Sequence, residues 1–301
     1  MKMLFHTVVV LSLLGLGSVE SAPHTDDSDS DSSEHGVIAT DVQNNCTCGV
    51  ANKEDQRIVE GRATKKHEYP LMVGIVRHDE DIVCCGGTII TPRHILTAAH
   101  CTAQFEPNEL GIHIGYHNYE EVKKTTKLLE PQEFFIHDDY YYLTLKYDIS
   151  VILTKQPIEF GANIGPACLP KEKIHLEGER VKVLGWGHTS YRGELSDVLL
   201  KVNLDIQPLE QCRFDNPHLE LGDRHQICTF RKNKDSCNGD SGGPLLWRDP
   251  DTNRYTLVAI TSYGYNCAKY PAVSSDVFYF LPWIQSIIAK TDPSYQTCAK
   301  M

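Results

Sequence analysis

The stretch Asp235-Ser-Cys-Asn-Gly-Asp-Ser-Gly-Gly-Pro244 places Ser241 in a loop of glycines and acidic residues. A serine hydroxyl is a weak nucleophile, so it needs a base to take its proton and donors for the oxyanion that forms. Glycine lets backbone amides approach a reacting carbonyl group, because it has no side chain. The stretch therefore predicts a nucleophilic serine, provided that a histidine and an aspartate stand in fitting contexts elsewhere.

Both partner residues are present in such contexts. His100 lies among small residues in Thr97-Ala-Ala-His-Cys101, and Asp148 leads into an apolar run in Tyr147-Asp-Ile-Ser-Val-Ile152. The order along the chain is therefore His, Asp, Ser. With these motifs the sequence resembles the chymotrypsin-fold serine proteases of the trypsin type, over residues 58–288. Its short Cys-x-Cys-Gly propeptide further resembles those of arthropod salivary, venom and haemolymph proteases.

The resemblance implies a role for each of these residues. Ser241 attacks the substrate carbonyl, His100 takes and returns the proton, and Asp148 orients the imidazole ring. The backbone N–H groups of Gly239 and Ser241 form the oxyanion hole. This chemistry needs no cofactor. No metal site is expected either, because the loop 115–121 lacks the acidic pattern of calcium-binding trypsins.

The residue pattern of the chain after Arg57 predicts an all-β fold. Short runs rich in Val, Ile, Leu and Thr recur between Gly, Pro and Asn, at 71–76, 87–90, 181–184, 198–206 and 257–261. One helical pattern closes the chain, with Pro282 as its expected first residue. The resemblance implies two six-stranded antiparallel β-barrels with a C-terminal α-helix. His100 and Asp148 would come from the first barrel and Ser241 from the second.

Three domains are expected. Residues 1–21 resemble a signal peptide, with Lys2 before a run from Leu4 to Leu16 that is too short to span a bilayer. Residues 22–57 form an acidic, partly disordered propeptide, and 58–301 form the protease domain. The net charge is −11, and 22–57 contributes eight acids and two bases. No basic patch favours nucleic acid and no later segment favours a membrane, so we expect a secreted, extracellular protein.

A second motif predicts synthesis as a zymogen. Arg57-Ile-Val-Glu-Gly61 resembles the activation site of the family, so a cut after Arg57 would free the amino group of Ile58. The resemblance implies that this ammonium then pairs with Asp240. The cut would be made by a trypsin-like protease or by the protein itself.

Substrate preference depends on Asp235, six residues before Ser241. The resemblance places this carboxylate at the floor of the primary pocket, where it would pair with Arg or Lys of the substrate. Ser236, Ser262 and Gly264 match other substrate-binding positions. Ala272 stands where trypsins usually have glycine, so a narrowed pocket is an alternative. A chymotrypsin- or elastase-like preference is opposed by Asp235.

The chain has eleven cysteines, which in a secreted protein predict a disulfide framework. The resemblance implies the bridges Cys85–Cys101, Cys212–Cys228 and Cys237–Cys267, and a bridge from Cys168 to Cys46 or Cys48. The spare member of that pair could join Cys298 and leave Cys84 as a thiol, but the sequence leaves this open. A further family bridge is replaced by Val181 and Trp247, which predicts an apolar contact there.

These features predict a secreted serine endopeptidase that acts on protein or peptide substrates and meets protein inhibitors. It would be a monomer with a disulfide-tethered propeptide, and Asn45-Cys-Thr47 is a glycosylation sequon. The main rival from another class is a catalytically silent binding protein on a protease scaffold. The complete set of His100, Asp148 and Ser241 argues against that rival.

Overall fold

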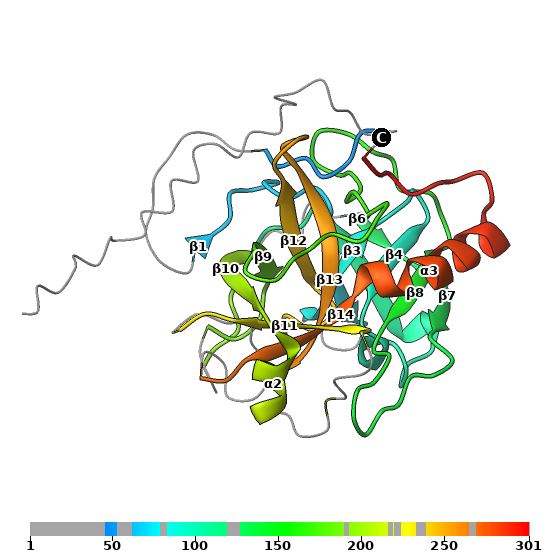
Figure 1. The fold of residues 1–301 in the computed structure, drawn as a ribbon. Coiled ribbons are helices and arrows are strands. Elements are labelled where there is room, and N and C mark those ends of the chain that lie inside the picture. Colours follow the sequence, from blue (N-terminus) through cyan, green and yellow to red (C-terminus); the bar gives the residue numbers. More distant parts are fainter. Residues whose placement is uncertain are drawn as a thin grey trace, which may run out of the picture. The chain divides into compact units, whose positions relative to one another are not determined.

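A computed structural model of the chain describes residues 46–52, 62–78, 83–118, 127–189, 193–215, 219, 224–232, 239–264 and 269–300. The predicted signal peptide, the acidic part of the propeptide, the sequon at Asn45 and the activation site at Arg57 lie outside these residues. Two curled antiparallel sheets and a C-terminal helix make up most of the described chain (Figure 1).

The first sheet is a nearly closed barrel with the strand order β6-β5-β2-β3-β4-β8-β7. Its strands are β2 (Met72–Arg77), β3 (Val83–Ile89), β4 (His94–Thr97), β5 (Leu110–Ile114), β6 (Lys127–Leu129), β7 (Pro131–Ile136) and β8 (Ser150–Thr154). Only Glu130 separates β6 from β7. One continuous segment therefore pairs with β5 at its start and with β8 at its end, which brings the two edges of the sheet together.

The second sheet is a closed barrel, because β9 pairs with both β10 and β12. Its strands are β9 (Arg180–Gly185), β10 (Leu200–Gln207), β11 (Gln226–Phe230), β12 (Pro244–Asp249), β13 (Arg254–Gly264) and β14 (Ala272–Asp276), and the short β1 (Arg62–Ala63) joins at β10. Closure leaves no long unpaired edge among these six strands. The short helix α2 (Leu209–Asp215) follows β10.

Apolar, β-branched residues account for the barrels' interiors. All five residues of β8, Ser-Val-Ile-Leu-Thr, are buried. The second barrel has its own core, which includes Val181, Leu204 and Val258. Val181 stands opposite Trp247 in the register of β9 and β12, and both belong to this core region. The apolar contact predicted for these two positions is therefore present.

The C-terminal helix α3 (Val277–Thr291) begins five residues before the predicted start. The Asp276 carboxylate accepts the backbone N–H groups of Phe278, at 2.9 Å, and Tyr279, at 3.4 Å. This cap satisfies donors of the first turn, so the helix begins there and Pro282 lies inside it. The prediction that Pro282 opens the helix was wrong, whereas the two barrels and the helix itself are confirmed. No helix among the described residues is long and apolar enough to cross a membrane.

Candidate active site

The Asp148 carboxylate is the centre of a buried hydrogen-bond cluster. It has no exposed surface, and its Oδ2 lies 2.7 Å from Nδ1 of His100. Its Oδ1 accepts the backbone N–H of His100 at 2.9 Å. The Ser262 hydroxyl donates to Oδ2 at 2.5 Å. A carboxylate can only accept a hydrogen bond here, so Nδ1 of His100 carries the proton. Nε2 is then the ring nitrogen that can accept a proton.

Neighbouring strands bring His100 and Asp148 together. His100 lies in the short helix η2 (Ala99–Cys101), which follows β4 after one residue, and Asp148 lies two residues before the start of β8. Because β4 and β8 are antiparallel and Thr97 pairs with Ser150, the end of one strand and the start of the other meet at the same edge. The disulfide Cys85–Cys101 ties the residue after His100 to β3.

The loop that contains Ser241 has two positions whose backbone conformation favours glycine. Gly239 and Gly242 have φ values of +98° and +76°, in the left-handed region. A Cβ on Gly242 would lie 2.2 Å from Oγ1 of Thr97 and 2.5 Å from the Gly86 carbonyl oxygen. The N–H of Gly86 donates to the Ser241 carbonyl at 2.7 Å. The loop, which leads into the second barrel, is therefore fastened through its main chain to β3 of the first.

Asp240 fills a cradle next to the serine. Its Oδ1 accepts the N–H of Gly187 at 2.8 Å. A Cβ built on Gly185 would lie 1.8 Å from the same oxygen, so that position has no room for a side chain. The predicted partner of Asp240, the amino group of Ile58, lies outside the described residues, as does Arg57.

The residues predicted to contact substrate are placed in part. Ser262 is buried, and Gly264 is exposed at the end of β13. Ala272 opens β14 as the register partner of Gly264, and its methyl carbon lies 3.4 Å from where a Cβ on Gly264 would stand. Asp235 and Ser236 lie outside the described residues. The described part of the site thus includes the methyl group of Ala272, but not the Asp235 carboxylate that this methyl group would crowd.

Four disulfides join the described cysteines: Cys46–Cys298, Cys48–Cys168, Cys85–Cys101 and Cys212–Cys228. Of the two partners left open for Cys168, the structure has Cys48. The thiol of Cys84 donates to the Ile75 carbonyl at 3.4 Å. The predicted bridge Cys237–Cys267 lies outside the described residues.

The glycine of the Cys-x-Cys-Gly motif has a packing reason. Gly49 has a φ of +62°, and a Cβ there would lie 2.3 Å from the Tyr255 carbonyl oxygen and 2.9 Å from Sγ of Cys168. Its carbonyl accepts the N–H of Tyr255 at 2.9 Å, and its N–H donates to Pro166 at 2.8 Å. Segment 46–52 is therefore packed against β13 of the second barrel, and its disulfides run to Cys168, between the barrels, and to Cys298, after α3.

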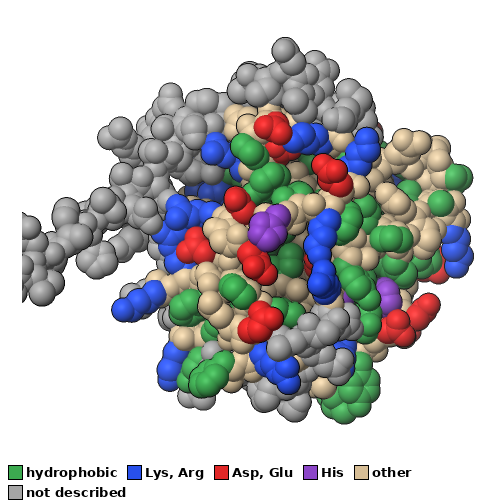
Figure 2. All heavy atoms as spheres, viewed as in Figure 1, with side chains coloured by type: hydrophobic (Ala, Val, Ile, Leu, Met, Phe, Trp, Pro, Cys, Tyr) green, Lys and Arg blue, Asp and Glu red, His purple; other side chains and the backbone are tan. Residues whose placement is uncertain are grey.

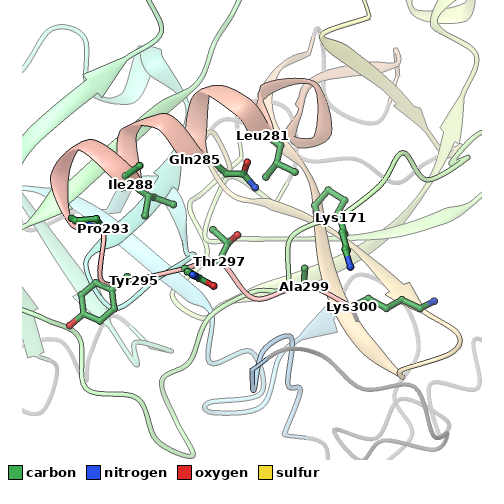
Figure 3. A pocket seen from close by; sticks show the side chains of 12 residues that line it. Lys171, Leu281, Gln285, Ile288, Pro293, Tyr295, Thr297, Ala299 and Lys300 are labelled. Carbon is green, nitrogen blue, oxygen red and sulfur yellow. The ribbon is translucent and has the colours of Figure 1, made fainter.

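Two other features were considered as binding sites for a metal or a ligand. Within the described chain, the cysteine and histidine atoms close enough to hold a metal belong to Cys85, His100 and Cys101. The two sulfurs are joined in a disulfide, so neither is the thiolate that a metal requires. A cavity of about 460 Å³ lies between α3 and the C-terminal tail (Figure 3), and it is lined by residues such as Leu281, Tyr295 and Lys300.

The surface of the molecule has no dominant charge on the face shown in Figure 2. Blue Lys and Arg side chains alternate there with red Asp and Glu side chains, and neither sign gathers in one region. This face accords with a net charge that is only moderately negative after residue 57, where 31 acids oppose 26 bases.

The hydroxyl groups of Ser262 and Ser275 are contacts that sequence reasoning missed. Ser262 was predicted to bind substrate through its backbone, and its side chain in addition bonds the Asp148 carboxylate. The Ser275 hydroxyl donates to the Asp148 carbonyl at 2.7 Å. Both contacts join β13 and β14 of the second barrel to a residue more than 100 positions away, and no local pattern in the sequence signals them.

Comparison with known proteins decides the family. The Trypsin family model matches residues 58–284, which is most of the chain. The chain belongs to the trypsin family. It is 38% identical over 250 residues to venom serine protease 34 of Apis mellifera, a match that covers 80% of this chain but 60% of that protein. It is 36% identical over 257 residues to a venom serine protease of Polistes dominula, covering 83% of this chain and 91% of that protein.

A third relative of the trypsin family is the clotting factor G beta subunit of Tachypleus tridentatus. It is 31% identical over 248 residues, covering 77% of this chain and 79% of that protein. The resemblance predicted from the His100, Asp148 and Ser241 motifs is therefore confirmed at the level of the family. The matched region contains both barrels and all three of these residues.

Proposed function

We propose that this protein is a secreted serine endopeptidase of the trypsin type, made as a zymogen. The His100–Asp148 pair is the observation that carries the proposal. Its 2.7 Å contact occupies Nδ1, and the imidazole keeps 24% of its side-chain surface exposed while the carboxylate has none. A partly exposed base held by a buried acid is the arrangement that general-base activation of a serine requires.

In the proposed reaction, Ser241 attacks the carbonyl carbon of the peptide bond, and Nε2 of His100 takes the hydroxyl proton. The N–H groups of Gly239 and Ser241 bind the oxyanion of the tetrahedral intermediate. His100 then gives the proton to the leaving amine, and water repeats the sequence on the acyl-enzyme. Asp148 keeps the imidazole oriented and stabilises its cation. The left-handed Gly239 supports this proposal, since it turns the backbone next to the nucleophile.

Activation follows from a cut after Arg57, which frees Ile58 to pair with Asp240. The cradle of Gly185 and Gly187 supports this part, because it holds the Asp240 carboxylate beside the Ser241 loop. Residues 22–57 form the propeptide, and 58–301 form the protease domain. After the cut, the bridges Cys48–Cys168 and Cys46–Cys298 would keep the propeptide attached as a light chain.

The proposed substrates are proteins or peptides cut after Arg or Lys, with Asp235 as the charge that selects them. The methyl of Ala272 next to Gly264 supports a narrowed pocket, so one of the two basic residues would be preferred. A trypsin-like protease, or the protein itself, would make the activating cut, and protein inhibitors would limit the product. Two relatives are venom proteases by name, which supports secretion after removal of residues 1–21.

A covalent probe tests the proposal directly. The purified full chain is treated with a fluorophosphonate before and after a cut at Arg57, with Ser241→Ala as the matched control. We expect labelling at Ser241 in the cut protein, weak labelling in the uncut protein, and none in the variant. Cleavage of paired Arg and Lys peptide substrates should accompany labelling. A cut protein that is not labelled would instead be the silent binding protein.

A gel tests the light chain separately. After the cut, the two chains should migrate together without reductant and apart with it. The double variant Cys46→Ser/Cys48→Ser should release the light chain without reductant. Release from the wild-type protein without reductant would exclude the tether.

A further inference from the structure

Asp148 lies at the apex of a very tight turn. The N–H of Ile149 donates to the Tyr147 carbonyl at 2.8 Å, so Asp148 is the central residue of a three-residue turn. Tyr147 has a φ of +51°, which is rare for an aromatic residue. Such a conformation persists only where the surroundings hold it in place.

The Tyr147 ring is the middle member of a stack of three rings. It lies against His225 with centroids 4.4 Å apart and planes 5° from parallel. On its other side lies His137, at 5.1 Å and 19°. Phe280 of α3 packs edge-on against Tyr147, with their ring centroids 6.0 Å apart. Aromatic rings in such contact favour one relative arrangement, so the stack holds the tyrosine in one orientation.

The stack and the neighbouring Phe280 come from three parts of the fold. His137 follows β7 of the first barrel, and His225 precedes β11 of the second. His225 is buried, and its carbonyl accepts the N–H of Asp276, the residue that caps α3. The ring of Tyr147 is thus held between two barrels and a helix, one residue away from Asp148.

Asp148 has further contacts with the second barrel through Ser262 and Ser275. These bonds act on the carboxylate and on the carbonyl, respectively. The ring stack holds Tyr147, the residue before Asp148, and so limits rotation of the whole turn. A small rotation here would move the carboxylate away from Nδ1 of His100, and misplacement of about 1 Å can cost about 10²-fold in rate.

We propose that Tyr147 is a positioning residue, and that its stacking between His137 and His225 aims the Asp148 carboxylate at His100. The inference rests on the proposed function, in which His100 is the base. The proposed residues take no part in the proton transfer of the reaction and do not contact the substrate. The stack acts through Asp148 on the orientation of the imidazole ring.

The test compares Tyr147→Leu with Tyr147→Phe in the activated protein. The first removes the ring and the second keeps it. We expect Tyr147→Leu to lower kcat by about 10- to 100-fold while KM changes by less than about twofold, and Tyr147→Phe to keep kcat within about threefold. Tyr69→Leu is the matched control, since Tyr69 is a buried ring that packs edge-on against Tyr255. It should lower thermal stability without lowering kcat.

A second readout does not depend on activity. The proton between Nδ1 of His100 and Asp148 should give a downfield NMR signal in the wild type and in Tyr147→Phe. The signal should broaden or shift in Tyr147→Leu, but not in Tyr69→Leu. If the wild type shows the signal but cleaves nothing, the proposed function fails while the positioning role stands. Equal kcat in the Leu and Phe variants, with unchanged signals, would overturn the positioning role.

Discussion

The two barrels hold their parts of the candidate site by different means. On the first, the Asp148 carboxylate accepts the backbone N–H of His100 and bonds two side-chain groups, the imidazole of His100 and the hydroxyl of Ser262. On the second, the Ser241 loop is held by its main chain, through Gly86 and the left-handed Gly242. The acid–base side therefore depends on which functional groups are present. The nucleophile side depends on which side chains are absent.

This difference predicts two kinds of sensitivity. On the acid–base side, a substitution that keeps the shape of a side chain but alters its hydrogen bonding should lower the catalytic rate strongly. On the nucleophile side, even one added methyl should be harmful if it strikes the loop. Regions of either barrel remote from the site should affect stability rather than rate.

The largest effect is expected from Asp148→Asn. The amide keeps the shape of the carboxylate, but its NH₂ group can donate to Nδ1 of His100 and so favour the wrong tautomer. We expect kcat/KM on an Arg peptide substrate to fall by about 10⁴-fold, the size of the effect in a related protease. Asp197→Asn is the control, because that side chain is exposed. A loss of less than about tenfold for Asp148→Asn would break the comparison.

A smaller loss is expected from one methyl on the other side of the site. Gly185→Ala would place a Cβ 1.8 Å from Oδ1 of Asp240, so the carboxylate must leave Gly187. The Ser241 loop would move with it and misplace an oxyanion donor, which costs about 10²- to 10³-fold in kcat. Gly161→Ala, whose Cβ would meet nothing within 4 Å, is the matched control. The rates of labelling by the fluorophosphonate should follow the same order.

The smallest effect concerns His94, a buried residue of the first barrel that bonds Thr91 at 2.6 Å and Thr291 of α3 at 2.8 Å. Burial lowers its pKa from 6.5 to about 4, while Asp292 opposes and Arg93 adds to this shift. The unfolded chain therefore binds a proton between these pH values that the folded chain does not. Stability from the neutral ring is complete above pH 6.5 and is lost as the pH falls toward 4, by about 2–3 kcal/mol.

Urea unfolding of the uncut chain at pH 7 and about pH 4.5 measures this loss. His94→Gln should show a difference between the two pH values that is smaller than that of the wild type by about 2–3 kcal/mol. His175→Gln, at an exposed position, should match the wild type. An unchanged pH dependence in His94→Gln would mean that other groups dominate acid unfolding.

Much of the fold could be predicted because its signals are local. The runs of Val, Ile, Leu and Thr predicted β-structure, and they lie within the observed strands or overlap them by most of their length. Motifs around His100, Asp148 and Ser241 are short and contiguous, so the resemblance to the trypsin family could be drawn from them alone. The helix start was missed because only Pro282 was considered as its first residue, whereas the Asp276 carboxylate accepts the N–H groups of Phe278 and Tyr279 and caps the helix earlier.

The sequence by itself determined the fold family, the candidate catalytic groups and the apolar replacement of a family bridge by Val181 and Trp247. Tertiary structure alone decided that Cys48 rather than Cys46 joins Cys168, that Ser262 and Ser275 bond Asp148, and that the ring of Tyr147 stacks against His137 and His225. The physical reason lies in the range of the interactions. Periodicity and motif chemistry are properties of neighbouring residues, whereas a hydrogen bond or a ring stack between barrels exists only after packing has placed distant segments within a few ångströms of one another.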